Sequence, residues 1–452
     1  MKMDMKTKHI FFIGIAFVSV MASVIGTEAW GQAMTLRDCM AYAISNSTKV
    51  RIQEAEIGDA QIARRNAVLK AFTPTISGST YAYYNFGRSI DPETNIYVTE
   101  TSFHNGYSLG AGITLFNGFE AVNNLKISTT SLAIGQTQDK QVEADICLAV
   151  MEAYYNVVYY KRLCDIYEAQ VSVAEASLQK LQKQEEIGQK SHADVVQAEA
   201  DLADRRYDAI EARNQYADQR TNLADLMFWP VDQELVIDTE IGTFTFALED
   251  KESVIDYALS HDPGVKIAGW QVENARRELA TARWQLLPSL SFNAGWSTSY
   301  FNYPGKDIQV DPYRDQLRNH QGEYLQLSMS IPIYNRLQGH DNIARKRNAV
   351  KKMTAQYDQK RREVASEVQR AVQDRDGAQA AYEQALRKAS VQEEAYQLNA
   401  KKMEQGLISS IEYQTATNNY LRAQADEMNS LFKYLIKQAV VRYYNGVEYI
   451  NQ

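Results

Sequence analysis

The stretch YSLGAGITL at residues 107–115 decides the fold class, because apolar side chains alternate along it with small or polar ones. Tyr107, Leu109, Ala111, Ile113 and Leu115 share one side, and serine, glycine and threonine occupy the other. A period of two predicts a β-strand with one apolar and one polar face. A soluble sheet packed on a core would alternate in the same way, so this stretch alone leaves that alternative open.

Three further stretches alternate in the same way, at residues 76–83, 286–297 and 325–333. Strands of 10 or more residues are long enough for a tilted crossing of a bilayer. Aromatic residues gather at both ends of the strands, as in barrels whose rims lie at the membrane interfaces. They are Phe72, Phe116 and Tyr334 at one end, and Tyr84, Phe86, Tyr300 and Phe301 at the other. The pattern favours a barrel in lipid, with polar outer loops at 88–104 and 304–321.

The chain is internally duplicated. YAISN at 42–46 returns as YALSH at 257–261, an offset of 257 − 42 = 215, and Gly188 returns as Gly406, an offset of 406 − 188 = 218. One short loop insertion explains the change in offset. We expect a first repeat at 34–230, a linker at 231–250 and a second repeat at 251–452, each with the order helix, strand, loop, strand, very long helix, glycine turn, long helix.

Two very long helices are predicted. Residues 118–187 would span about 105 Å as one helix. No proline falls between 118 and 228 or after 332, and proline inside a helix costs about 3 kcal/mol. Apolar residues follow a heptad seam from Ile146 to Leu181. Arg375, Gln392 and Asn399 interrupt the matching seam of the second repeat, which predicts that part of it faces water. An ordinary coiled coil without a lumen is the alternative; the membrane strands favour a tube.

Each long helix is expected to end at a glycine, Gly188 or Gly406, because glycine tolerates the left-handed conformation of a helix C-terminus. The next helix then opens with Ser-x-x-Asp at 191–194 or Ser-x-x-Glu at 409–412. This spacing is that of a capping box, which is the favoured interpretation of both acids. The functional alternative is a ring of carboxylates that selects ions on a pore axis.

The first 33 residues have the pattern of a signal peptide: a basic start, an apolar run from Ile10 to about Ile25, and small residues within 31–33 before an expected cleavage after Ala33. A membrane anchor is the alternative, although the apolar run is short for a span. After residue 33 no apolar run reaches the roughly 18 residues of a membrane helix. An integral membrane protein would therefore cross the bilayer as strands.

Composition points away from other functions. The net charge of −8 argues against a nucleic-acid binder. The six histidines show no metal-ligand spacing, and no phosphate loop or nucleophile motif is present, so no catalytic residue, metal or cofactor is expected. Cys39, Cys147 and Cys164 are interpreted as buried packing residues.

Four strands cannot close a barrel, because an open sheet edge in lipid leaves backbone groups unpaired. The duplicated strand–loop–strand units, the openings at 36–46 and 254–263 and the paired glycine turns resemble the TolC-like outer-membrane efflux proteins. The resemblance covers about residues 35–446. It implies an α+β membrane protein: a homotrimer whose twelve-stranded β-barrel, four strands per chain, continues into a long α-helical coiled-coil tunnel.

The resemblance also implies a function and partners. The chain would be the outer-membrane channel of a tripartite efflux or type I secretion system, with its helical part in the periplasm. It would contact outer-membrane lipids and dock to a periplasmic membrane-fusion adaptor protein, which links it to an inner-membrane transporter. The family's adaptor-contact positions fall at Gly188, Gln189, Gly406 and Leu407. A periplasmic coiled-coil scaffold or adaptor without a barrel is the alternative, and the cargo stays open.

The family's aperture acids lie six and nine residues after the second turn glycine. Glu412 fills the first position and Thr415 the second, while Asp194 is the corresponding acid of the first repeat. The family's closing arginine and tyrosine would fall at Ile408 and Met403. The chain therefore keeps only part of the family's closing network.

Overall fold

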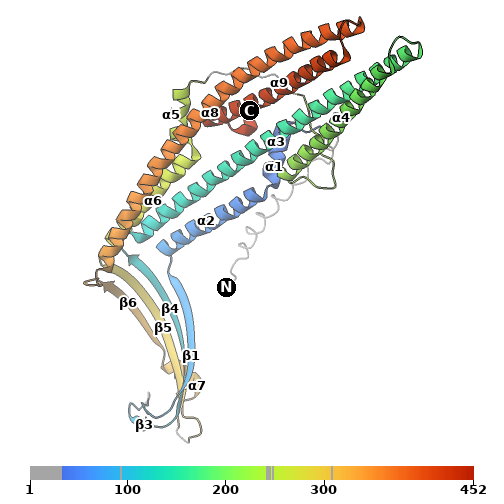
Figure 1. The fold of residues 1–452 in the computed structure, drawn as a ribbon. Coiled ribbons are helices and arrows are strands. Elements are labelled where there is room, and N and C mark those ends of the chain that lie inside the picture. Colours follow the sequence, from blue (N-terminus) through green and yellow to red (C-terminus); the bar gives the residue numbers. More distant parts are fainter. Residues whose placement is uncertain (1–32, 92–93, 241–245, 247–248, 307–308) are drawn as a thin grey trace, which may run out of the picture.

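The computed structural model describes residues 33–91, 94–240, 246, 249–306 and 309–452. A curved sheet forms one end of the molecule, and helices run from it to two hairpin tips at the other end (Figure 1). The predicted signal peptide at 1–33 lies outside the described residues except for Ala33. Among the helices of the described part, none is long and apolar enough to cross a membrane.

The sheet has four antiparallel strands in the order β1-β4-β5-β6. They are β1 (Thr75–Asn85), β4 (Ser102–Phe116), β5 (Ser289–Asn302) and β6 (Gly322–Ser330). All four correspond to the predicted strands. The last predicted residues of the fourth strand, 331–333, lie beyond the end of β6.

Both predicted outer loops contain regular structure. β4 begins inside the first loop because its pairing with β1 continues to Asn85 opposite Ser102. The same loop holds a small hairpin of β2 (Arg88–Ile90) and β3 (Tyr97–Thr99). The second loop holds α7 (Tyr313–Asn319). The first loop therefore ends before Ser102 rather than at 104, whereas the second lies between Asn302 and Gly322, close to its predicted bounds.

Residue pairing joins the apolar sides of the strands into one face. Ile76 lies opposite Ala111, Ala111 opposite Ala294, and Ala294 opposite Leu325. Directly paired residues point to the same side of a sheet. In this single chain the face is open to solvent, with Ile76 77% and Leu325 79% exposed.

Phe301 differs from its prediction as a ring at a lipid-facing strand end, because it is only 2% exposed. β6 begins only at Gly322, opposite Ser297, so the last residues of β5 lack that partner strand. Gln316 of α7 takes its place: its amide nitrogen donates to the Phe301 carbonyl over 2.9 Å, and its oxygen accepts from the Phe301 N–H over 3.0 Å. The neighbouring helix therefore covers this edge and buries the ring.

The helices repeat in two sets. The first contains α1 (Leu36–Asn46), α2 (Thr48–Phe72), α3 (Glu120–Glu186) and α4 (His192–Leu226). The second contains α5 (Lys251–His261), α6 (Pro263–Trp284), α8 (Gln338–Glu404) and α9 (Ser410–Tyr444), followed by the short η1 (Tyr449–Asn451). α3 and α8 have 67 residues each, which is about 100 Å of helix.

Each long helix forms a hairpin with the helix that follows it, α3 with α4 and α8 with α9 (Figure 1). Nearer the sheet, α2 packs along α3, and α6 packs along α8. α3 also contacts α6 and α9, which joins the two repeats. Beside the sheet the helices therefore lie in the order α2-α3-α6-α8, which parallels the strand order β1-β4-β5-β6.

Much of the heptad seam is buried, as its pattern indicates, and Val157 in the first repeat and Val364 and Val368 in the second are fully enclosed. The prediction that Arg375 opens the second seam to water is wrong, since Arg375 is 2% exposed. Its guanidinium lies 2.6 Å from a carboxylate oxygen of Glu249 and 2.8 Å from Asp376. The two acids compensate the buried charge, which lets an arginine occupy a core position.

The largest core lies where α1, α3, α4, α9 and η1 meet. Cys39 and Cys147 belong to it, and all three cysteines are buried and free, as predicted. Burial raises the pKa of the Cys39 thiol to about 12. Met34 pairs with Ile237 in a parallel bridge, so the linker is held against the start of α1.

Candidate functional site

The two hairpin tips have the same backbone geometry. Gly188 and Gly406 adopt left-handed conformations, with φ of +73° and +72°. A Cβ at either glycine would meet no atom within 4 Å. The backbone conformation, rather than crowding, therefore accounts for glycine at both turns.

Both predicted capping boxes are present. The Ser191 hydroxyl accepts from the Asp194 N–H over 3.3 Å, and the Asp194 carboxylate accepts from the Ser191 N–H over 3.1 Å. Ser409 and Glu412 repeat the exchange over 3.3 and 3.0 Å. The hydrogen bonds from Ser191 hold the pKa of Asp194 below its usual range. Both acids therefore have a structural role at the start of a helix.

The other predicted site residues lie on or near the tips. Gln189 and Leu407 are exposed beside the turn glycines. The Thr415 hydroxyl donates to the Ile411 carbonyl over 2.8 Å, so it serves its own helix. Met403 and Ile408 are half-buried and supply no strong hydrogen-bonding side chain.

A polar contact between the two hairpins went unpredicted. Arg205 of α4 is 7% exposed, and its guanidinium donates to the Asn418 side chain of α9 over 2.8 Å. Asp201 lies 3.3 Å from the same guanidinium. The spacing of four between Asp201 and Arg205 on one helix could have indicated their ion pair from the sequence. The partner on α9 is 213 residues away, and no local pattern indicates it.

At the opposite end of the molecule, both edges of the sheet are open. Within the described chain β1 pairs only with β4, and β6 only with β5. An unpaired edge presents a row of backbone donors and acceptors that can pair with another strand. The sheet thus combines an exposed apolar face with two unpaired edges.

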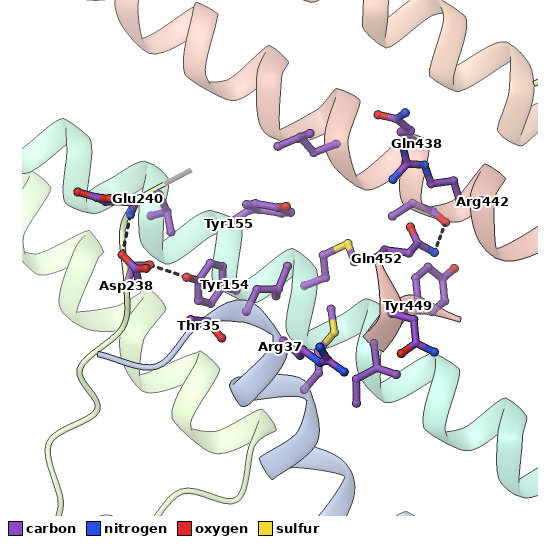
Figure 2. A pocket seen from close by; sticks show the side chains of 18 residues that line it. Thr35, Arg37, Tyr154, Tyr155, Asp238, Glu240, Gln438, Arg442, Tyr449 and Gln452 are labelled. Carbon is purple, nitrogen blue, oxygen red and sulfur yellow. Dashed lines mark hydrogen bonds between the residues drawn. The ribbon is translucent and has the colours of Figure 1, made fainter. Parts of the chain in front are cut away.

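Figure 2 shows a pocket of about 540 Å³ beside the core, between α1, α3, α9, η1 and the linker. The Tyr154 hydroxyl donates to the Asp238 carbonyl over 2.5 Å, and the Glu240 N–H donates to the Asp238 carboxylate over 2.9 Å. Gln452 donates to the Ala439 carbonyl. These bonds hold the linker and the last residues against the helices. In the described part of the chain no three His, Cys, Asp or Glu side chains form a group that could hold a metal.

The duplicated strands and hairpins correspond to a known pattern. The family profile of the outer membrane efflux proteins matches residues 41–227 and 254–446. The chain belongs to the outer membrane efflux protein family. Each matched stretch contains one full set of long hairpin and strands, so the resemblance inferred from the sequence is confirmed.

One related protein is the outer membrane efflux protein BepC of Brucella suis biovar 1 (strain 1330), which is 25% identical over 285 residues. That alignment covers 60% of this chain and 57% of BepC, so the chain matches little more than half the length of this relative.

Solved membrane channels and outer membrane proteins share the fold. CusC superimposes with a TM-score of 0.73 at 16% identity, over 91% of this chain and 92% of CusC. CmeC of Campylobacter jejuni gives 0.73 at 13%, over 92% of this chain and 85% of CmeC. VceC of Vibrio cholerae gives 0.72 at 15%, over 91% and 96%. At these identities the likeness concerns the fold alone.

Proposed function

We propose that this chain is the outer-membrane channel subunit of a tripartite efflux or type I secretion system. It would pass substrate from an inner-membrane transporter and a periplasmic membrane-fusion adaptor to the exterior. Membership of the outer membrane efflux protein family supports this proposal. The name of BepC, an outer membrane efflux protein, is consistent with it.

The observation that carries the proposal is the sheet, with its exposed apolar face and two open edges. In lipid every backbone polar group needs a partner, so such a sheet must close with other copies. Three copies of the four-stranded sheet would supply 3 × 4 = 12 strands, an even number of the kind that barrels use. The apolar face would contact lipid and the other face would line the pore.

The helices would form the periplasmic tunnel. In the proposed trimer the first repeat (34–230) and the second (251–452), joined by the linker at 231–250, each contribute one long hairpin to its wall. Helices of about 100 Å reach far below a bilayer core of about 30 Å. The exposed turns at Gly188, Gln189, Gly406 and Leu407 are the proposed contacts for the adaptor.

Glu412, Asp194 and Thr415 are the proposed aperture residues, one copy of each from every subunit. Glu412→Gln tests this, because glutamine keeps an oxygen for the cap but removes the charge. We expect lower cation selectivity in single-channel recordings. The hydrogen-exchange rates of the amides at the tip should stay unchanged. Unchanged selectivity would leave Glu412 with its cap alone.

The first test of the whole proposal is fractionation of cells that express the full chain. Outer membranes are separated from periplasm and washed with urea and with alkaline carbonate. A lipid-embedded barrel stays in the outer membrane until detergent releases it. Release by the washes, or recovery from the periplasm, would contradict the barrel and favour the alternative, a soluble coiled-coil scaffold or adaptor.

A further inference from the structure

The polar face of the sheet carries exposed tyrosine rings on a wall without charge. We propose that this face binds planar aromatic solutes, cationic ones best, as they cross the barrel. The inference rests on the proposed channel, since only a closed barrel turns this face toward a pore. It adds a substrate class to that channel.

The wall lacks charged side chains, so it cannot select solutes by ionic attraction. Within β1, β4, β5 and β6, every residue whose side chain shares the face of Ser77, Ser108, Asn293 and Gln326 is uncharged. Serine, threonine, asparagine and glycine predominate. Without charged side chains the wall attracts neither cations nor anions by net charge, so uncharged groups must distinguish one solute from another.

Two tyrosines lie flat on this wall because glycines lie beneath them. A Cβ at Gly106 would come within 2.3 Å of the Tyr81 ring, and a Cβ at Gly295 within 2.3 Å of the Tyr324 ring. Each tyrosine is paired across strands with its glycine. Even so the rings stay open to solvent, with Tyr81 54% and Tyr324 52% exposed. Each therefore lies against the wall and leaves surface available to a solute.

A row of stacked rings extends from one of these tyrosines across the sheet. Tyr81 stacks with Tyr83 at 5.8 Å between centroids, and Tyr83 with His104 at 4.9 Å and an angle of 13°. His104 stacks in turn with Phe301 at 6.2 Å. Because neighbouring rings hold one another, Tyr81 and Tyr83 are set in place before a solute arrives.

The exposed ring faces favour flat aromatic ligands and cations. Aromatic faces carry partial negative charge, so they attract flat aromatic groups and cations. Stacking on exposed aromatic side chains tolerates many chemical structures, since every planar ring system has a face to offer. The wall thus fits planar aromatic cations better than aliphatic cations of the same charge.

The test is block of the reconstituted channel in planar bilayers. Ethidium is the planar aromatic cation, and tetraethylammonium is the aliphatic cation of equal charge. In the wild-type channel ethidium should block at the lower concentration. Removal of both flat rings in Tyr81→Leu/Tyr324→Leu should raise the half-blocking concentration of ethidium about fivefold per ring, which is about 1 kcal/mol each. Block by tetraethylammonium should not change.

Tyr84→Leu is the matched control, because Tyr84 lies on β1 but on the apolar face and is similarly exposed. It should leave ethidium block unaltered. Gly106→Ala, which pushes the Tyr81 ring off the wall, is a second variant with the same expected loss. Equal block by both cations in a conducting wild-type channel, or equal effects of Tyr81→Leu and Tyr84→Leu, would overturn this inference alone. A protein that conducts no ions would overturn the channel and this inference together.

Discussion

The buried ion pair between Arg375 of α8 and Glu249 of the linker offers a test of how much this contact stabilises the fold. Glu249→Ala would leave the Arg375 guanidinium, whose side chain is 3% exposed, with Asp376 as its remaining ion-pair partner among the residues that the structure describes. Removal of one partner from a buried pair costs about 3–5 kcal/mol. Because Asp376 stays 2.8 Å away but is 57% exposed, its compensation is partial, and we expect the lower end, about 3 kcal/mol.

This loss converts to a shift in melting temperature. An unfolding entropy of about 2.1 cal/mol/K per residue, over the 452 − 33 = 419 residues that follow the predicted signal peptide, is about 0.88 kcal/mol/K. A loss of about 3 kcal/mol then lowers Tm by about 3 °C. Circular dichroism at 222 nm, at fixed protein and detergent concentrations, measures it.

Two further variants make the test specific. Asp374 also pairs with a lysine, Lys437, at 2.8 Å, but both side chains are about half exposed. Asp374→Ala should therefore cost less than about 1 kcal/mol. The double variant Arg375→Met/Glu249→Leu should recover most of the loss, since apolar residues of similar size can replace a buried pair. Equal melting of Glu249→Ala and Asp374→Ala would refute the reasoning.

Three other predictions concern the tips and the core. Ser409→Ala removes a cap worth about 1 kcal/mol, so amides in the first turn of α9 should exchange about fivefold faster; Glu412→Gln should leave them unchanged, and equal rates in Ser409→Ala and wild type would contradict the cap. In the proposed tunnel the contact between Arg205 and Asn418 ties α4 to α9. Its removal in Arg205→Met should let the two hairpins separate and so raise the single-channel conductance; an unchanged value would show that the contact does not restrict the pore. Burial and a pKa of about 12 should protect Cys39 from iodoacetamide at pH 8 until the protein is denatured, and labelling of the native protein would contradict its place in the core.

The features that the sequence predicted are those written in local patterns. Alternation along 107–115 identified a strand because successive side chains of a strand point to opposite sides. The seam from Ile146 to Leu181 identified a long helix because its period is that of a packed helix. The serine–acid spacing at both tips identified capping boxes, since all their bonds join residues three apart.

The candidate site was predictable only in part. The turn glycines and the capping acids were identified, and both have the expected geometry. The roles proposed for Glu412, Asp194 and Thr415 in a pore stay predictions. The tyrosines on the polar face were readable as strand residues, but their flat orientation depends on the glycines that strand pairing places beneath them.

The sequence by itself determined the duplication, the strands, the two long hairpins and their caps, because the strands, helices and caps each follow from a pattern of residues a few positions apart, and the duplication is the repetition of those patterns along the chain. Only the tertiary structure decided which side chains meet across the fold. Arg375 finds Glu249 across 126 residues, and Arg205 finds Asn418 across 213. Phe301 is buried because α7 folds back over the end of β5. Partners so distant are brought together by the packing of whole helices and strands, which no short stretch of sequence encodes.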